Sequence, residues 1–121
     1  MKLHSGRAPR LLPRMRVLCG EKVALGPGKA ELLAFIDKSG SIREAAERMG
    51  MSYMRAWKLI KIMNACFREP VVTACRGGRN HGGASLTETG RSALKLYRGL
   101  ETRSVRACAG IWGKLHLLLR D

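Results

Sequence analysis

Acidic residues are scarce in this chain of 121 residues. Nine Asp and Glu stand against twenty-three Lys and Arg, which gives a formal net charge of +14 at pH 7. A surface this basic repels itself, so it points to a polyanionic partner, with nucleic acid first and an anionic membrane face second. Apolar residues make up 45% of the chain. That is enough for a real core and excludes a disordered basic tail.

Aromatic and catalytic side chains are also few. The chain has two Phe, two Tyr and two Trp with no interleaved stacking platform, which disfavours RNA binding. Its three isolated His, nine acids and four scattered Cys offer no nucleophile–base pair and no metal-binding set. The sequence therefore predicts no enzyme, no cofactor and no metal. The cysteines lack any C-x-x-C pair and are expected to be reduced thiols, at Cys19, Cys66, Cys75 and Cys108.

Export and membrane segments are missing as well. The first 16 residues lack the apolar stretch of a signal peptide, and the longest apolar stretch, near residues 111–119, is too short to span a bilayer. We therefore expect a cytoplasmic protein that does not associate with a membrane. A mass of 13.3 kDa suits one compact domain, with or without an appended long element.

The basic charge is spread unevenly along the chain. Residues 29–49 hold four bases and four acids, whereas residues 52–68 hold four bases and no acid, and Arg76 and Arg79 follow in another acid-free segment. The anion-facing surface should lie there. Residues 1–16 carry five bases, no acid and two prolines, so we expect residues 1–15 to form a mobile or loosely docked basic arm.

Local signals predict a series of short elements. Residues 15–25 alternate weakly and indicate one short strand or a hairpin, and a helix follows over residues 29–38. Ser41-Ile42-Arg43-Glu44 is a capping box, in which the Ser41 hydroxyl accepts from the backbone of Glu44 and Glu44 reaches back to the Ser41 amide. The helix that begins at Ile42 should end sharply at Gly50.

Ser52 is the next N-cap candidate and opens a longer helix. Its basic residues lie off an apolar stripe, which consists of Ala56, Leu59, Ile60, Met63 and Phe67. Two helices joined by a tight Gly turn are typical of a helix-turn-helix, although the same layout also occurs in helical cores that bind nothing. The acid-free outer face of the second helix favours DNA binding.

A glycine-rich hairpin is predicted after the helix-turn-helix. Strands are expected over residues 71–75 and 84–87, and the segment 76–83 between them contains four glycines and several basic side chains. This is typical of the wing of a winged helix. A phosphate-binding loop is the competing interpretation, but Ala84 stands where that motif needs lysine.

The order of these elements resembles a known family, the N-terminal DNA-binding domain of the molybdate-responsive ModE regulators within the wider LysR-type winged helices. The similarity covers roughly residues 29–100. Its most specific parts are Ser52-Tyr53 with Ala56-Trp57 and Met63-Asn64, followed by Gly77-Gly78, Gly82-Gly83-Ala84 and Leu86-Thr87. The resemblance implies a dimeric transcriptional regulator. Full-length family members also carry C-terminal oxyanion-binding domains, for which 121 residues leave no room, so no molybdate domain is expected in this chain.

The winged-helix geometry assigns roles to the basic and exposed positions. The first turn of the second helix should reach base edges, with Arg55 bonding a guanine and Met54 packing on a thymine methyl, while Tyr53 and the later lysines meet phosphates. The wing tip should enter a minor groove or grip the backbone. The predicted DNA-binding residues are Ser41, Ser52, Tyr53, Met54, Arg55, Lys58, Lys61, Arg76, Arg79, Asn80 and His81.

Some of these positions have plainer alternatives. Lys58 and Lys61 are also compatible with a solvated helix surface, Met54 with a partly buried position, and His81 with a turn. Trp57 is the reverse case. Two residues after an exposed Arg it could stack on a sugar or a base, but it is expected in the core, because an amphipathic helix usually buries its tryptophan between elements.

The C-terminal segment can form one helix from Glu88 to about Leu119, weakened by three glycines. Its apolar residues recur at spacings 3-4-3-4, the pattern of two packed helices. The predicted dimerisation residues are Val105, Cys108, Trp112, Leu115 and Leu119. A second copy of the chain is the simplest partner, and a homodimer would bind a palindromic operator.

Together these patterns predict a mostly α fold with a small β-hairpin wing, a winged helix-turn-helix with a long C-terminal dimerisation helix. The expected division is residues 1–15 as the basic arm, 16–90 as the DNA-binding domain and 91–121 as the dimerisation helix. The predicted function is sequence-specific binding of double-stranded DNA in transcriptional regulation. A nonspecific, nucleoid-type DNA-binding protein is the alternative, since the net charge fits both.

Overall fold

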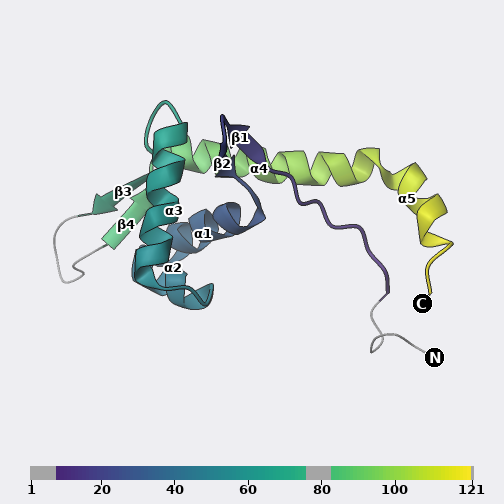
Figure 1. Cartoon of the computed structure of the whole chain (residues 1–121), viewed down its shortest axis with the longest axis horizontal. Coiled ribbons are helices and arrows are strands. Elements are labelled where there is room, and N and C mark those ends of the chain that lie inside the picture. Colours follow the sequence, from purple (N-terminus) through teal and green to yellow (C-terminus); the bar gives the residue numbers. More distant parts are fainter. Residues whose placement is uncertain (1–7, 76–82, 121) are drawn as a thin grey trace.

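The computed structural model describes residues 8–75 and 83–120. These residues form five helices and four strands (Figure 1). In chain order they are β1 (Val17–Cys19), β2 (Lys22–Leu25), α1 (Pro27–Ser39), α2 (Ile42–Arg48), α3 (Tyr53–Cys66), β3 (Val72–Cys75), β4 (Gly83–Leu86), α4 (Glu88–Ala107) and α5 (Ala109–His116). The predicted mostly α fold with a hairpin wing is confirmed. The β3–β4 hairpin and α5 lie at opposite ends of the molecule, and α4 spans most of the distance between them (Figure 1).

Helix α1 begins two residues before the predicted start. Pro27 occupies its first turn, where the fixed φ of proline suits a helix and its missing N–H removes no bond. The helix ends at Gly40, which adopts a φ of 71° and donates its N–H to the carbonyl oxygen of Ile36 at 2.8 Å. A side chain at this φ would be strained, so glycine fixes the direction in which the chain leaves α1.

The helix-turn-helix is built by side-chain caps. The Ser41 Oγ accepts from the Glu44 N–H at 3.1 Å and starts α2, as predicted. The other half of the expected capping box is wrong, because the Ser41 N–H donates to the Ser39 Oγ at 3.2 Å instead of to Glu44. Gly50, with a φ of 66°, makes the turn, and the Ser52 Oγ then accepts from the Arg55 N–H at 3.1 Å to start α3.

The core lies where α1, α2 and α3 meet β4 and the first half of α4. On α3, the side chains of Ala56, Ile60 and Met63 are fully buried, and Leu59 and Phe67 pack against them, so the predicted apolar stripe is confirmed. The largest fully buried side chains are Tyr97, Leu32, Leu33, Ile36, Ile60, Met63 and Val71. This burial holds the inner face of α3 in place and leaves its outer face to solvent.

Two antiparallel hairpins flank the helices. Residues 17–25 form the β1–β2 hairpin. The β3–β4 hairpin pairs Val72 with Leu86 and Cys75 with Gly83, and of the predicted wing segment 76–83, residues 76–82 lie outside the described residues. β3 is followed by β4 in an antiparallel pair, whereas the strand before a phosphate-binding loop is followed by a helix.

Side-chain and backbone bonds fix the wing to the helices. The Asn64 Oδ1 accepts from the N–H groups of Val71 and Val72, at 2.8 and 3.2 Å, which ties the start of β3 to α3. The Ala84 N–H donates to the Gly40 carbonyl oxygen at 3.0 Å, which ties β4 to the turn between α1 and α2. The wing therefore has a set position relative to the helix-turn-helix.

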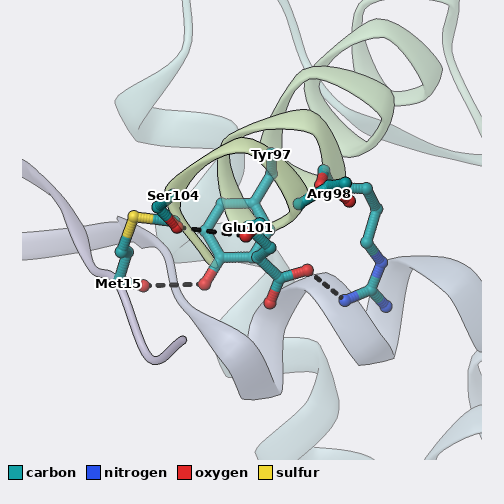
Figure 2. Close-up of polar contacts among 6 residues, drawn as sticks. Met15, Tyr97, Arg98, Glu101 and Ser104 are labelled. Carbon is teal, nitrogen blue, oxygen red and sulfur yellow. Dashed lines mark hydrogen bonds and ion pairs between the residues drawn. The ribbon is translucent and has the colours of Figure 1, made fainter. Parts of the chain in front are cut away.

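The first half of α4 belongs to the core. Tyr97 is buried, and its hydroxyl donates to the Met15 carbonyl oxygen at 2.7 Å (Figure 2). The next residue, Arg98, forms an ion pair at 3.0 Å with Glu101, one turn further along the same helix (Figure 2). The end of the predicted arm thus docks against α4, and the expected domain border at residue 90 falls inside this helix.

The C-terminal segment is not one continuous helix. The expectation of a single helix from Glu88 to about Leu119 is wrong, because the chain breaks at Cys108, where ψ is 2°, and α5 ends at His116. Gly110 and Gly113 lie two and five residues after Cys108. Glycine is the least favourable residue after proline in a helix interior, so little local preference opposes the bend.

Candidate nucleic-acid interface

The outer face of α3 is exposed and basic. Met54 is 72% exposed, and the side chains of Arg55, Lys58 and Lys61 lie in solvent on the side away from the core. No Asp or Glu occurs between Ser52 and Arg68. Met54, Lys58 and Lys61 are therefore brought together on one accessible face, and Arg55 is exposed beside it.

A shallow groove of about 580 Å³ runs over this face. Its lining residues are Lys22, Met54, Trp57, Lys58, Lys61, Ile62 and Ala65. Lys22 comes from β2 and was not among the predicted site residues. No local motif signals its role, because only the folding of the β1–β2 hairpin against α3 brings it there.

Trp57 lies in this groove and is 38% exposed. The prediction that it belongs to the core is wrong. The buried stripe of α3 runs through Ala56, Ile60 and Met63, and the next residue after Ala56 is rotated by about 100° around the helix axis. Its spacing from Met54 and Lys61, three and four residues away, places it with the outer residues, a signal that the sequence already contains.

Tyr53 and Ser41 hold positions that serve the fold. The Tyr53 ring is half-buried against the core, and the Arg43 guanidinium lies 5.1 Å from its centroid. The Ser41 Oγ is engaged as the cap of α2. Contacts of either residue with DNA stay predictions, as do those of Arg76, Arg79, Asn80 and His81, which lie outside the described residues.

A second concave surface, of about 400 Å³, lies on the other flank of α3. It combines three cationic side chains, Arg16, Lys29 and Arg55, with Gly28 in the first turn of α1. The Lys29 Nζ donates to the Val23 carbonyl oxygen at 2.6 Å, and burial lowers the pKa of this ammonium group, with Arg16 acting in the same direction. Arg55 therefore borders both the helix face and a cationic hollow, where backbone N–H groups and positive side chains favour phosphate oxygens.

The predicted dimerisation residues do not form one continuous row. Val105 lines a hollow with Leu12 and Pro13 of the arm, and Cys108 is the bend itself. Beyond it, Trp112 stacks on His116 with centroids 5.1 Å apart, while Leu115 and Leu119 are exposed. Leu96 and Leu100 of α4 are also exposed and were not among the predicted dimerisation residues, although their four-residue spacing places them on one face of the helix.

The described residues lack both a metal-binding cluster and a membrane-spanning helix. In the ranges 8–75 and 83–120, no three His, Cys, Asp or Glu side chains lie close enough to hold a metal ion. Nor does any helix in these ranges combine the length and the apolar composition needed to cross a membrane.

No family model matches the chain. It is 40% identical over 94 residues to the molybdenum transport protein ModE of Azotobacter vinelandii, which is 78% of this chain and 35% of that protein. Over 77 residues it is 38% identical to the DNA-binding transcriptional dual regulator ModE of Escherichia coli K12, covering 64% of this chain and 29% of that one. The chain thus spans about a third of the length of these relatives.

Among solved structures, a DNA complex of the CbnR DNA-binding domain matches 72% of this chain and 94% of its own, with a TM-score of 0.55 and 17% identity. That likeness supports the winged-helix fold seen here. The sequence similarity to the relatives lies in their N-terminal part. This chain is therefore a winged-helix homologue of the N-terminal part of the ModE regulators.

Proposed function

We propose that this chain binds double-stranded DNA in a sequence-specific manner and regulates transcription, without enzymatic activity, in the cytoplasm. The observation that carries the proposal is the outer face of α3, which is exposed, basic and free of acids. In a winged helix this element enters the major groove. The likeness to a named DNA-binding transcriptional regulator supports the same function.

The side chains divide by what they can recognise. Met54 and Arg55 lie on the first turn of α3 and are proposed to reach base edges. Lys58 and Lys61 lie one and two turns further along and suit phosphates, with Ser52, Tyr53 and Ser41 near the start of the two helices. Arg16 and Lys29 extend the cationic surface beyond the residues predicted from sequence.

A homodimer and a palindromic operator belong to the same proposal. Leu96, Leu100, Ile111 and Leu115 are exposed along α4 and α5. Apolar side chains repeated along a helix favour packing against a second helix. A second copy of the chain would cover them and place two copies of α3 on one duplex, since twofold symmetry in the protein is mirrored in the operator.

Selection of binding sites from a pool of random duplexes tests the function. The full chain should enrich a defined sequence and bind it on the order of a thousandfold more tightly than random duplex. Enrichment of no sequence, with equal affinity for all duplexes, would favour the nonspecific alternative. A lysine outside the proposed interface provides the control for variants of the basic face. Lys38, on α1, is exposed, and Lys38→Ala should leave the affinity for the selected duplex unchanged.

Two variants separate base contacts from phosphate contacts. Arg55→Ala should lower affinity for the selected site by about 1–3 kcal/mol and change binding to random duplex little. Lys61→Ala should weaken both and reduce the salt dependence of log K by about one unit. Equal losses of Arg55→Ala on both duplexes would make Arg55 a phosphate contact, in keeping with its place beside Arg16 and Lys29.

A further inference from the structure

Two large apolar side chains stand exposed at the start of α3. Met54 is 72% exposed and Trp57 is 38% exposed, and both line the same groove. They are three residues apart on one helix, so their side chains are neighbours on its surface. In the proposed orientation of α3, this pair would lie in the part of the helix that reaches base edges.

The charged residues around Met54 and Trp57 indicate which kind of molecule the groove can bind. Lys22, Lys58 and Lys61 line the same groove, and among the described residues no Asp or Glu lines it. Their cationic heads suit a polyanion, while their methylene stems extend the apolar floor of the groove. The occupant must therefore offer phosphates at the edges and an apolar group at the centre.

We propose that Met54 and Trp57 recognise the 5-methyl groups of thymine in the major groove; this inference rests on the proposed function. Thymine is the only base with an apolar group on its major-groove edge. Guanine, adenine and cytosine present polar edges there, and an apolar side chain would cover these without returning a hydrogen bond. The groove thereby favours thymine over cytosine at the positions that Met54 and Trp57 contact.

Deoxyuridine provides the test, because it differs from thymidine only by this methyl group. The probes are a duplex selected from random sequence by the full chain and copies of it in which each thymine in turn is replaced by deoxyuridine. At one or two positions in each half-site, the replacement should weaken binding by about fourfold, the value expected for one buried methyl group. Replacement at the remaining positions should have little effect.

Variants connect the loss to the two side chains. Met54→Ala and Trp57→Ala should each bind the all-thymine duplex more weakly and lose most of their sensitivity to deoxyuridine at one of these positions. Leu18, on β1, is 62% exposed and lies outside the groove, so Leu18→Ala should keep the full sensitivity. Met54 has most of its side chain in solvent, so Met54→Ala should fold even if Trp57→Ala does not.

Three outcomes would overturn the inference. If a sequence is selected but no deoxyuridine replacement matters, the proposed function stands and methyl recognition by this pair is wrong. If replacement weakens binding equally for the wild type and both variants, the methyl groups act through other residues or through the shape of the duplex. If no sequence is selected at all, the proposed function fails, and the inference falls with it.

Discussion

The helix-turn-helix region and the C-terminal region use apolar residues in opposite ways. From Leu25 to Tyr97, the apolar side chains of α1, α2, α3 and β4 close on one another, and many are fully buried. In α5, by contrast, none of the described residues is buried, although Ile111, Trp112 and Leu115 are apolar. Both regions are helical, so secondary structure does not distinguish them. The first region therefore carries its own core, whereas the second has apolar surface that the described residues of the chain leave exposed.

Removal of the C-terminal region should produce the largest effect on DNA binding. A chain that ends after Leu100 keeps the buried Tyr97 and should stay folded, but it loses the exposed residues of α5. We expect a monomer whose affinity for a full palindromic site falls by about 10²–10⁴, since the second half-site no longer binds as part of one molecule. Affinity for a half-site should change little.

Light scattering of the two chains and titration with full and half sites check this prediction. A shortened chain that is still dimeric and binds the full site as before would assign α5 to another task. Binding of a different protein would then be the preferred interpretation of its apolar surface.

Two leucine-to-alanine variants compare how much each region contributes to the stability of the protein. Leu33 is fully buried in α1, and Leu33→Ala should lower the free energy of unfolding by about 2–5 kcal/mol through the cavity it leaves. Leu118, beyond α5, is 81% exposed, and Leu118→Ala should change it by less than about 0.5 kcal/mol. Urea titrations of both variants measure this. Similar losses would mean that Leu118 is covered in solution, either by its own chain or by a second copy.

Two glycines of α4 distinguish the part of this helix that packs on the core from the part that lies in solvent. A Cβ at Gly90 would lie 2.1 Å from the carbonyl oxygen of Val71, which is backbone and has little room to move. Gly90→Ala should therefore destabilise the protein by about 3 kcal/mol. At Gly99, apart from the adjoining residues and backbone of its own helix, no described atom lies within 4 Å of a Cβ, so Gly99→Ala should stabilise the helix by about 0.5–1 kcal/mol. Thermal unfolding should show opposite shifts, and a fall for both variants would mean that Gly99 faces a close neighbour.

Local signals explain which parts of the fold were predictable from sequence. Ser41 and Ser52 start their helices, and Gly40 and Gly50 end the preceding ones, because each acts through its own backbone or a residue three positions away. The buried stripe of α3 was likewise predictable, because its apolar residues recur with the helical period of 3.6 residues. These features need no knowledge of the rest of the chain.

The features of the fold and of the candidate site that could not be predicted depended on more than local sequence, chiefly on contacts between segments distant in the chain. Lys22 and Arg16 reach the surface beside α3 only because the β1–β2 hairpin folds against it. Trp57 was assigned to the core from its residue type, whereas its place on the helix put it outside. The bend at Cys108 interrupts a heptad pattern that is regular in sequence, since spacing alone does not report ψ at one residue.

The smallest expected effect concerns the contact between the arm and α4. The Tyr97 hydroxyl donates to the Met15 carbonyl oxygen at 2.7 Å (Figure 2), and burial raises the pKa of Tyr97, so the hydroxyl stays a donor to a more alkaline pH than an exposed tyrosine. Tyr97→Phe keeps the buried ring and removes only this bond. The free energy of unfolding should fall by about 1 kcal/mol, the usual net value of one hydrogen bond.

The arm should respond more clearly than the core to this change. Without the bond to Met15, the segment before β1 is less firmly held, so hydrogen exchange should quicken in residues 8–16 and stay slow in α1 and α3. Ser39→Ala provides the control, because it removes the hydrogen bond that the Ser39 hydroxyl donates to the Phe35 carbonyl oxygen at the end of α1, and Ser39 does not line the hollow beside the arm. If exchange in the arm is unchanged in Tyr97→Phe, the arm is held by the apolar contacts of Leu12 and Pro13 in the hollow beside Val105, and the hydrogen bond only completes them.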